Sequence, residues 1–399
     1  MQKTKAILLK RGREDSLRRK HPWIFSGAIA NIEGSPGSGE TVNVISCDGI
    51  VLAVGAYSPH SQISVRIWSF EPDEIIDVNF FRDKINKAFQ SRRLIYSDRE
   101  ISACRLIYAE SDSLPGLIVD KFGDYLVCQF LSAGPELWKA SIVDALKEIV
   151  PSCKGIYERS DTPARGKEKL PEKTGILAGE VPDGMIQIDD GNYKFNINMR
   201  EGHKTGFYLD QRHNREITGR FLDGLEVLDC FSYSGGFTIA ALKAGARKVT
   251  MIDSSAEAIA LAKQNIELNG LSLSSVETIE DNVFTTLRKF RDSRRSFDAI
   301  ILDPPKFAES EKDLNRAGRA YKDINLLGIK LLRPGGLLST FSCSHYMDME
   351  LFKKTVAFAA MDAGRTVRII HQLHQAPDHP IALNFPEGEY LKGLLCRVE

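Results

Sequence analysis

The feature that most constrains this chain is the alternation of short apolar strands with helices from residue 220 onward. Strands are predicted at residues 226–230, 248–253, 297–302 and 336–341, and helices at 237–244, 256–270 and 314–332. Strands that alternate with helices form a parallel sheet, because each helix returns the chain to the edge where the previous strand began. The last two strands, about 366–373 and 390–398, have only a loop between them and are predicted to pair antiparallel. The second half of the chain is therefore expected to be a doubly wound α/β sheet.

Two further units are expected before this sheet, since 399 residues exceed the usual size of one hydrophobic core. Residues 1–75 show short strands broken by turn residues, which favours a small β-barrel, and residues 76–184 mix helices with strands, as in a central α/β domain. The stretch 159–175 is rich in charge, proline and glycine and is predicted to be an exposed loop. A hairpin around the turn 189–192 then opens the third domain, residues 185–399.

Charge is balanced overall but uneven along the chain. Lysine plus arginine and aspartate plus glutamate number 53 each, so net charge by itself does not indicate a polyanionic partner. The first 25 residues are nevertheless basic, with only Glu14 and Asp15 against Lys3, Lys5, Lys10, Arg11, Arg13, Arg18, Arg19 and Lys20. The last three precede Trp23 and Phe25, and such a mixture of cations and aromatic rings is typical of RNA contacts. The alternative is a solvated loop with both rings in the barrel core.

The cysteines and histidines argue against metal chemistry. The seven cysteines are scattered singly with no C-x-x-C pair, and His203, His213 and His345 lack the spacing of metal ligands. We therefore expect neither a metal site nor a disulfide framework, and a reducing cytoplasm fits best. No apolar run approaches the roughly 18 residues of a membrane span, and the first 25 residues hold no signal-like core. Cys230 is assigned to packing in the turn after its strand, and the inert core residues are predicted to be Cys47, Cys104, Cys128, Cys153 and Cys396.

Unusual residues follow the strands at the edge where a doubly wound sheet binds ligands. Gly235 and Gly236 would let the backbone approach a ligand, and Asp253 ends the next strand, where a carboxylate can bind ribose hydroxyls. A nicotinamide dinucleotide would use the same geometry, but the G-x-G-x-x-G spacing that admits a pyrophosphate is missing from residues 231–237. S-adenosylmethionine has no phosphate, so one glycine turn suffices. A tight turn that holds no ligand is the structural alternative.

Two further strand ends carry polar residues. Asp281-Asn282-Val283 follows the third strand and could read an adenine edge; the alternative is that Asp281 caps the helix 283–290. Asp303-Pro304-Pro305-Lys306 follows the fourth strand. Its prolines fix the backbone and remove two donors, which leaves the Asp303 carboxylate and the carbonyls to meet a flat polar group. A purely structural turn is the alternative.

Cys343 decides which chemistry to expect, because it ends a strand between Ser342 and Ser344 at the edge that also carries Asp303. Carbon 5 of a pyrimidine is a poor nucleophile. A thiolate that adds to carbon 6 makes it enamine-like and able to take a methyl group from a sulfonium donor. Asp303 would hold the ring through N3 and the exocyclic amine. The alternative for a lone cysteine is an inert core residue.

Six stretches spread over nearly the whole chain form a specific combination. They are RKHPWIFSG at 19–27, ESDSLPGL at 110–117, YERSD at 157–161, KTGFYLDQR at 204–212, DPPKF at 303–307 and YLKG at 390–393. Together they resemble the bacterial large-subunit ribosomal RNA methyltransferase I family, which forms 5-methylcytosine in 23S rRNA. The resemblance implies an N-terminal PUA domain, a central α/β domain and a C-terminal class I (Rossmann-like) methyltransferase domain.

The resemblance also implies roles for individual residues, with Cys343 as nucleophile and the segment 204–212 in the wall of the donor pocket. The expected S-adenosylmethionine-binding residues are Gln211, Phe231, Ser232, Tyr233, Gly235, Asp253, Ser254, Asp281, Asn282, Val283 and Asp303. The expected RNA-binding residues are Arg18, Arg19, Lys20, Trp23 and Lys306. Many RNA cytosine-5 methyltransferases carry a second cysteine in the strand-four motif. That place is Pro305 here, so the sequence does not name the base that removes the carbon-5 proton.

Two other functions stay open beside cytosine-5 methylation of 23S rRNA. One is methylation of a base nitrogen, since DPP followed by an aromatic residue also suits nitrogen acceptors. The other is an RNA-binding assembly factor with a vestigial donor pocket. The target nucleotide, the form of the rRNA substrate and the oligomeric state are not legible in one chain, a homodimer being one alternative.

Overall fold

The computed structural model describes residues 5–97, 101–308 and 310–399, so Lys3 of the basic N-terminal stretch lies outside the described residues. The chain forms two compact units. Unit 1 comprises Met1–Ile188, Ile197–Leu209 and Pro377–Gly388, and unit 2 comprises Asp189–Asn196, Asp210–Ala376 and Glu389–Glu399. The predicted barrel and central domain thus fall in one unit, and segments distant in sequence complete it.

The N-terminal part of unit 1 is a six-stranded sheet. Its strands are β1 (Ala6–Leu9), β2 (Trp23–Phe25), β3 (Ile29–Glu33), β4 (Thr41–Ile45), β5 (Val51–Tyr57) and β6 (Ile63–Ser69), with helix α1 (Asp15–Arg18) between β1 and β2. They follow the order β2-β6-β5-β4-β1-β3. Ile7, Val42 and Val44 are buried in its core, as expected where alternate residues of a strand face inward. The strands predicted in this region are confirmed.

The second part of unit 1 is a five-stranded sheet covered by helices. The strands are β7 (Ala103–Tyr108), β8 (Leu117–Phe122), β9 (Tyr125–Phe130), β10 (Gly155–Ser160) and β11 (Lys173–Gly179), and the helices are α2 (Val78–Ile95), α3 (Ala133–Leu137) and α4 (Lys139–Ile149). The strand order is β11-β10-β9-β8-β7. Side chains of α2 and α4 share one core with this sheet, and Ala56 and Trp68 of the first sheet enter the same core. This shared core explains why both sheets form one unit.

The prediction of an exposed loop at 159–175 holds only for part of the segment, since most residues between 161 and 172 are exposed. Strands β10 and β11 occupy its ends, and Arg165 and Glu168 between them are buried. Arg165 donates to the carboxylate of Glu136 at 2.9 Å, and Glu168 accepts from Arg66 at 2.7 Å. A charged side chain can be buried when a partner compensates its charge, and for Arg165 and Glu168 the partners come from distant parts of the sequence.

Unit 2 is built on a seven-stranded sheet, preceded by the predicted hairpin of β12 (Ile186–Asp189) and β13 (Lys194–Ile197). The sheet strands are β14 (Glu226–Cys230), β15 (Lys248–Asp253), β16 (Val276–Glu280), β17 (Phe297–Leu302), β18 (Leu332–Ser342), β19 (Val367–His374) and β20 (Lys392–Val398). Their order is β16-β15-β14-β17-β18-β20-β19. The first five are parallel, whereas β20 runs antiparallel to both β18 and β19. The doubly wound sheet with an antiparallel end is confirmed.

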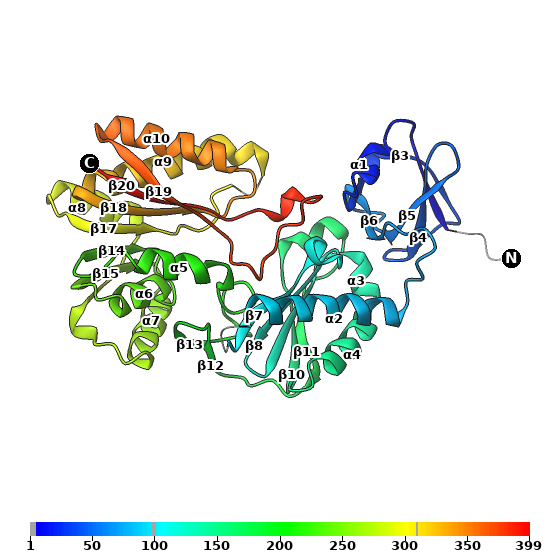
Figure 1. Cartoon of the computed structure of the whole chain (residues 1–399), viewed down its shortest axis with the longest axis horizontal. Helices are drawn as coiled ribbons and strands as arrows, with labels where there is room; N and C mark the ends of the chain where they lie inside the picture. Colours follow the sequence, from blue (N-terminus) through cyan, green and yellow to red (C-terminus); the bar gives the residue numbers. More distant parts are fainter. Residues whose placement is uncertain (1–4, 98–100, 309) are drawn as a thin grey trace. The chain divides into compact units, whose positions relative to one another are not determined.

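Helices cover both faces of this sheet. They are α5 (Arg212–Gly219), α6 (Gly236–Lys243), α7 (Ala256–Leu268), α8 (Val283–Asp292), α9 (Leu314–Leu331) and α10 (Met349–Ala363). Figure 1 shows α9 and α10 over one face and α5, α6 and α7 over the other. Adjacent residues Val227 and Leu228 enter different cores, so the strands are apolar on both sides, as parallel strands must be. Among the described helices, none is long and apolar enough to cross a membrane.

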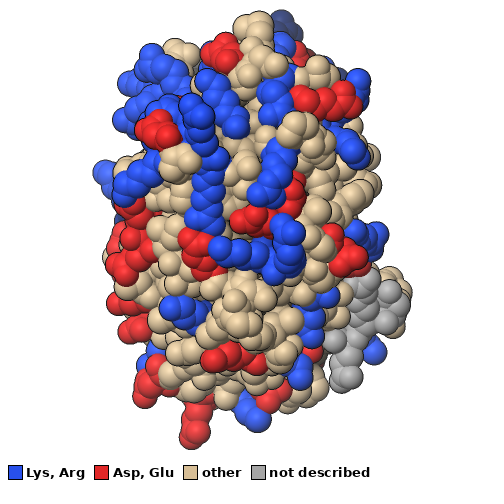
Figure 2. Space-filling view, turned by 90° about the vertical axis from the view of Figure 1, so that its left-hand side faces the viewer, with Lys and Arg blue, Asp and Glu red and all other residues tan. Residues whose placement is uncertain are grey.

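The side of this sheet where the parallel strands begin and the side where they end carry different residues. Val398 pairs with Gly336 near the beginning of β18, so the C-terminus marked in Figure 1 lies on the side where the parallel strands begin. Figure 2 shows this side of the molecule, where lysine and arginine side chains gather in the upper part with acidic side chains among and below them. Arg333 there pairs with Glu226 and Asp298. The opposite edge, where the parallel strands end, carries the candidate site.

Candidate active site

The polar residues predicted for the site lie where the parallel strands of unit 2 end. Phe231, Asp281, Asp303 and Cys343 directly follow β14, β16, β17 and β18, and Asp253 is the last residue of β15. Strand β14 has β15 on one side and β17 on the other, so the strand order reverses at this point. Such a reversal is where doubly wound sheets bind their ligands. The fold therefore brings these residues to one edge, as the sequence predicts.

The turn after β14 is strained and closely packed. Phe231 and Tyr233 adopt left-handed backbone conformations, with φ of 62° and 44°, and Gly235 has φ of 80°. A non-glycine residue in this region costs roughly 1–3 kcal/mol, and such strain clusters at functional sites. A Cβ atom on Gly235 would lie 3.0 Å from the Cβ of Ala262 on α7. Ser232 is buried in the turn, and its backbone carbonyl oxygen accepts the N–H of Gly235 at 2.8 Å. These features favour a ligand-holding turn.

Asp253 supports this turn from the next strand. Its two carboxylate oxygens accept the backbone N–H groups of Tyr233 at 2.9 Å and Ser255 at 3.0 Å. Each carboxylate oxygen has two lone pairs, so capacity remains for ribose hydroxyl groups. Ser255 caps α7 by accepting the N–H of Ala258 at 3.1 Å, and Ser254 before it is exposed. The remaining acceptor capacity of Asp253 fits the hydroxyl groups of a ribose, such as that of S-adenosylmethionine.

The residues after β16 are engaged by their own helix. Asp281 accepts from the hydroxyl of Thr286 and from Lys289, and these contacts, Lys289 first, hold the pKa of Asp281 below its usual range. The helix cap is Asn282, which accepts the N–H of Thr285 at 3.2 Å, and Val283 is buried. The alternative in which Asp281 itself caps the helix is therefore wrong by one residue, because the side chain of Asn282 is the one that reaches the free amide.

Asp303 is oriented by Gln211, the residue before α5, and by Asn214 on that helix. The side-chain amide of Gln211 donates to Oδ1 of Asp303 at 2.9 Å, and Asn214 donates to the Oε1 atom of Gln211 at 2.6 Å. Both amides are buried. Gln211, expected in the donor pocket, thus contacts the carboxylate after β17. Because its amide can only donate through nitrogen, the chain Asn214–Gln211–Asp303 fixes the direction of the carboxylate.

Cys343 lies beside the segment that follows β17. Its sulfur is 3.9 Å from the carbonyl oxygen of Pro304, and its side chain is partly accessible. The buried hydroxyl of Ser344 accepts the backbone N–H groups of Phe307 and Ala308, both at 3.2 Å. These bonds join the loop of Cys343 to the loop of Asp303. A thiol and a carboxylate are therefore held by connected loops at the same edge.

Burial distinguishes Cys343 from four of the other six cysteines. Cys104, Cys128, Cys230 and Cys396 are fully buried, and burial raises the pKa of Cys396 to about 12 and that of Cys230 well above its ordinary value. Cys153 is partly buried, and Cys47 is exposed, so its assignment as a core residue is wrong. Cys47 lies two residues after the last residue of β4, beyond the part of the strand that enters the core. Cys343 packs against the hydrophobic cluster of Val227 and Phe341 but keeps part of its side chain exposed, which is compatible with a reactive thiol.

One charged residue of this site was given no role by the sequence reasoning. Lys392, the first residue of β20, is only 2% exposed and donates to the carbonyl oxygens of Ser344 and Tyr390, both at 2.7 Å. Burial lowers the pKa of Lys392 to about 8. The sequence signals for it are a lysine at the start of a largely apolar strand and its place in the stretch YLKG at 390–393. Tyr321 on α9 is a second such residue, since its hydroxyl lies 3.1 Å from the Oγ atom of Ser344.

The residues predicted to bind RNA lie in unit 1, except for Lys306. Arg18, Arg19 and Lys20 are exposed on or next to α1, and Lys306 is exposed in its own loop. Trp23 is partly buried, donates its indole N–H to Glu110 at 2.7 Å and packs edge-on against Phe385 at 4.8 Å between ring centroids. Phe25 is 50% exposed. The alternative that places both rings in the barrel core is wrong, because β2 turns them toward its outer side.

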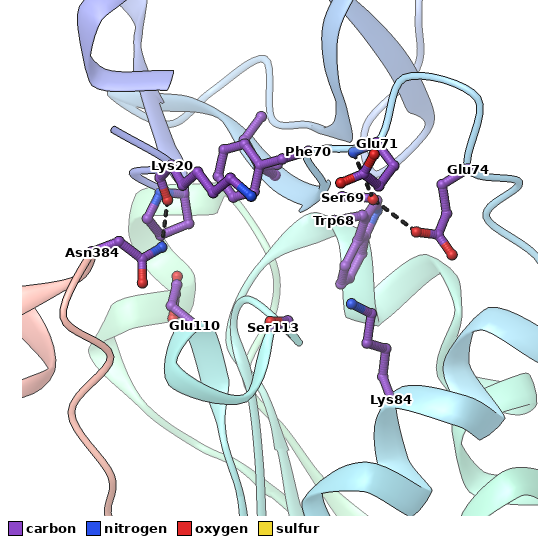
Figure 3. A pocket seen from close by; sticks show the side chains of 12 residues that line it. Lys20, Trp68, Ser69, Phe70, Glu71, Glu74, Lys84, Glu110, Ser113 and Asn384 are labelled. Atoms are coloured by element: carbon purple, nitrogen blue, oxygen red, sulfur yellow. Dashed lines mark hydrogen bonds between the residues drawn. The ribbon is translucent and has the colours of Figure 1, made fainter. Parts of the chain in front are cut away.

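One hollow of the molecule lies within unit 1. The cavity of about 190 Å³ in Figure 3 is lined by residues that include Lys20, Trp68, Glu71, Glu74, Lys84 and Glu110. Its carboxylates outnumber its lysines, which disfavours a phosphate ligand. It shares no lining residue with the strand ends of unit 2. Within residues 5–97, 101–308 and 310–399, the His, Cys, Asp and Glu side chains form no group of three or more that could hold a metal ion.

Comparison with known proteins agrees with this geometry. A PUA-like domain family matches residues 7–70, and an S-adenosylmethionine-dependent methyltransferase family matches residues 170–390. Two solved structures have the same fold over 98% of this chain and 99% of their own at 22% identity. One is described as a SAM-dependent methyltransferase from Streptococcus mutans, with a TM-score of 0.85, and the other as the methyltransferase SMU.776 complexed with SAH, with a TM-score of 0.86.

Curated relatives are similar along their whole length. A protein of Citrobacter koseri is 48% identical over 98% of this chain and 99% of its own, and one of Klebsiella pneumoniae strain 342 is 49% identical over 98% of each. A protein of Escherichia coli O157:H7 is 47% identical over 98% of this chain and 99% of its own. All three are named ribosomal RNA large subunit methyltransferase I.

Proposed function

This chain belongs to the ribosomal RNA large subunit methyltransferase I family, and from that premise we propose that it methylates carbon 5 of a cytosine in 23S rRNA. The protein is an S-adenosylmethionine-dependent methyltransferase with an N-terminal PUA-like domain. The proposal concerns the atom that receives the methyl group and the residue that activates it. The observation that carries it is the thiol of Cys343, accessible and 3.9 Å from the loop of Asp303.

In the proposed reaction Cys343 supplies the electrons that carbon 5 lacks. Its thiolate forms a bond to carbon 6, and the ring becomes an enamine whose carbon 5 is nucleophilic. S-adenosylmethionine would supply an electrophilic methyl group on a sulfonium, so that carbon 5 bonds to the methyl carbon as the sulfur–methyl bond breaks and a neutral thioether leaves. The carbon-5 proton then passes to water or another base, which restores the carbon 5–carbon 6 double bond and expels the thiolate. Cys343 thus ends the cycle unchanged.

Asp303 would hold the ring during this cycle. One carboxyl oxygen accepts the exocyclic N–H of the cytosine, and a proton shared between the other oxygen and N3 neutralises the charge that addition to carbon 6 creates. The bond from Gln211 at 2.9 Å supports this role, since it fixes the carboxylate before substrate arrives. Fixed groups cost no reorganisation in the transition state.

The donor site proposed for S-adenosylmethionine is the corner between β14 and β15. The turn Phe231–Gly235, with Ser232 and Tyr233, lets the backbone approach the donor, and Asp253 with Ser254 meets the ribose. Asp281, Asn282 and Val283 would border the adenine. Support comes from the left-handed turn and from the remaining acceptor capacity of Asp253.

We assign RNA binding to Arg18, Arg19, Lys20, Trp23 and Lys306. The four basic residues are exposed and can neutralise phosphates. The division into a PUA domain at 1–75, a central domain at 76–184 and a methyltransferase domain at 185–399 is part of the same proposal. The cytoplasm is the proposed compartment, supported by seven free cysteines.

The direct test is transfer of a radiolabelled methyl group to 23S rRNA from cells that lack the modification, followed by nucleoside analysis. We expect 5-methylcytosine from the wild type and a loss of at least 10³-fold with Cys343→Ala, because the addition to carbon 6 is removed. Cys153→Ala, a partly buried cysteine of unit 1, is the matched control and should keep its activity. Full activity of Cys343→Ala would remove the covalent mechanism. A methylated base nitrogen in the product, or no binding of S-adenosylmethionine by calorimetry, would instead favour the other two functions.

A further inference from the structure

The buried lysine at the start of β20 is not used by the reaction above. Lys392 lies opposite Ser342 in the antiparallel register of β18 and β20, so its backbone is next to the strand that ends at Cys343. Its ammonium group donates to the carbonyl oxygen of Ser344, the residue after Cys343, and to that of Tyr390. The side chain is 2% exposed. A positive charge is therefore enclosed beside the proposed nucleophile.

An ammonium group in this position is costly unless something compensates its charge. Transfer of a charged lysine from water to a protein interior costs several kcal/mol, and carbonyl dipoles return only part of it. Burial accordingly lowers the pKa of Lys392 to about 8, and a negative charge on Cys343 acts in the opposite direction, followed by Glu389 and Asp348. Among these three charges, that of the sulfur has the largest effect.

The same interaction must act on the sulfur in return. If a thiolate favours the ammonium form of the lysine, the ammonium form favours the thiolate by the same free energy. A further titratable group coupled to this sulfur is Tyr321 of α9, whose pKa is raised to about 12, mainly by burial and next by the charge of Cys343. Tyr321 is thus neutral at physiological pH. Asp303 follows β17, the strand next to β18, and a carboxylate opposes a thiolate. Lys392 is a cation that offsets this repulsion.

We propose that Lys392 is a positioning residue of the methyltransferase reaction, which holds the carbonyl of Ser344 and stabilises the thiolate of Cys343. This inference rests on the proposed role of Cys343 as nucleophile. When Cys343 ionises, its proton passes to solvent and the negative sulfur is left beside the ammonium group. Lys392 contacts no substrate and acts through Cys343.

The test measures the ionisation of Cys343 without RNA and without S-adenosylmethionine. Iodoacetamide reacts with the thiolate, and peptide mass spectrometry follows Cys343 apart from the other cysteines, over about pH 6 to 10. In Lys392→Met, which keeps the length of the side chain and removes the charge, we expect the half-maximal pH to rise by about one unit. At neutral pH this corresponds to roughly tenfold slower alkylation. Lys353→Met, at a partly exposed lysine of α10, should match the wild type.

The pH profile of methyl transfer gives a second readout that a structural defect would not produce. Lys392→Met should lose about tenfold in rate near pH 7 and regain most of it at a pH one to two units higher, where the thiol ionises without help. An equal alkylation midpoint in Lys392→Met and the wild type would overturn the inference. A shifted midpoint together with full activity of Cys343→Ala would uphold the pairing and refute the covalent mechanism, so the two failures are distinguishable.

If Lys392→Met does not fold, the reciprocal effect remains measurable. In Cys343→Ala, which removes only the sulfur from a partly accessible side chain, the pKa of Lys392 should fall relative to the wild type, as followed by NMR of lysine labelled at Cε. An unchanged or higher pKa of Lys392 in Cys343→Ala would contradict the pairing.

Discussion

At the residue scale, the sheet of unit 2 encloses a carboxyl group with little to offset its charge. Asp229 on β14 is 1% exposed, and its Oδ2 atom accepts from the hydroxyl of Thr238 at 2.7 Å. Its Oδ1 atom has no hydrogen-bond partner among the described residues. Burial raises the pKa of Asp229 to about 7, against an ordinary value of 3.8. The residue thus destabilises the fold whenever it is ionised.

The sign of this effect defines a test with Asp229→Asn. Between pH 4 and 7 the folded protein binds more protons than the unfolded chain, so stability falls as pH rises through this window. Asparagine does not ionise and keeps an acceptor for Thr238. We expect it to stabilise the protein by about 2 kcal/mol more at pH 8 than at pH 5, as measured by thermal unfolding.

Asp144→Asn is the matched control for this substitution, because Asp144 is exposed on α4 and should show no such pH dependence. A stability gain in Asp229→Asn that is equal at both pH values would contradict the ionisation argument.

At the element scale, the turn between β14 and α6 shows how strand, turn and helix depend on one residue. Gly235 provides a left-handed backbone and lets α6 approach α7. Local periodicity predicted β14 and the helix after it, because alternating and helical patterns depend on neighbouring residues only. It also predicted the glycine turn. It did not predict that Phe231 and Tyr233 share the left-handed conformation, since the cost is offset by tertiary contacts.

The left-handed backbone of Gly235 and its close packing against α7 can be tested separately by comparison with a second glycine, Gly270. Gly235→Ala has both a left-handed φ and a Cβ contact of 3.0 Å with Ala262, whereas Gly270→Ala has φ of 70° and nothing within 4 Å of the new Cβ. We expect Gly270→Ala to cost about 1 kcal/mol and Gly235→Ala at least twice as much in urea unfolding.

Calorimetry should also show weaker binding of S-adenosylmethionine to Gly235→Ala and unchanged binding to Gly270→Ala. Equal losses of stability in the two variants would show that packing against α7 contributes nothing at Gly235.

At the scale of the whole molecule, distant segments of sequence complete each unit. Pro377–Gly388, which connects β19 to β20 of unit 2, belongs to unit 1, where Phe385 packs on Trp23. Ile197–Leu209 also belongs to unit 1, where the hydroxyl of Thr205 donates to the buried Asp120 at 2.5 Å. The chain therefore crosses from unit 2 to unit 1 before each of these segments and returns to unit 2 after it. The strand of Lys392 begins a few residues after one of these anchored segments.

The anchoring of this segment is testable with Phe385→Ala. Phe385 is 6% exposed, so its truncation should lower the stability of unit 1 by about 3 kcal/mol and expose Trp23 to solvent. Unfolding followed by tryptophan fluorescence measures both effects.

Leu383→Ala changes a fully exposed side chain of the same segment and should stay within about 0.5 kcal/mol of the wild type. A comparable loss in Leu383→Ala would mean that the segment responds to any substitution and that the contact with Trp23 has no special weight.

The sequence by itself determined the parallel sheet of unit 2 and the gathering of Asp253, Asp303 and Cys343 at one edge. Both follow from local patterns, because parallel strands must end on the same side. Only the tertiary structure decided that Gln211 holds Asp303, that Arg165 is buried, and that Lys392 lies beside the loop of Cys343. These contacts join residues far apart in the chain, and the burial that makes them matter arises only when separate elements exclude water together.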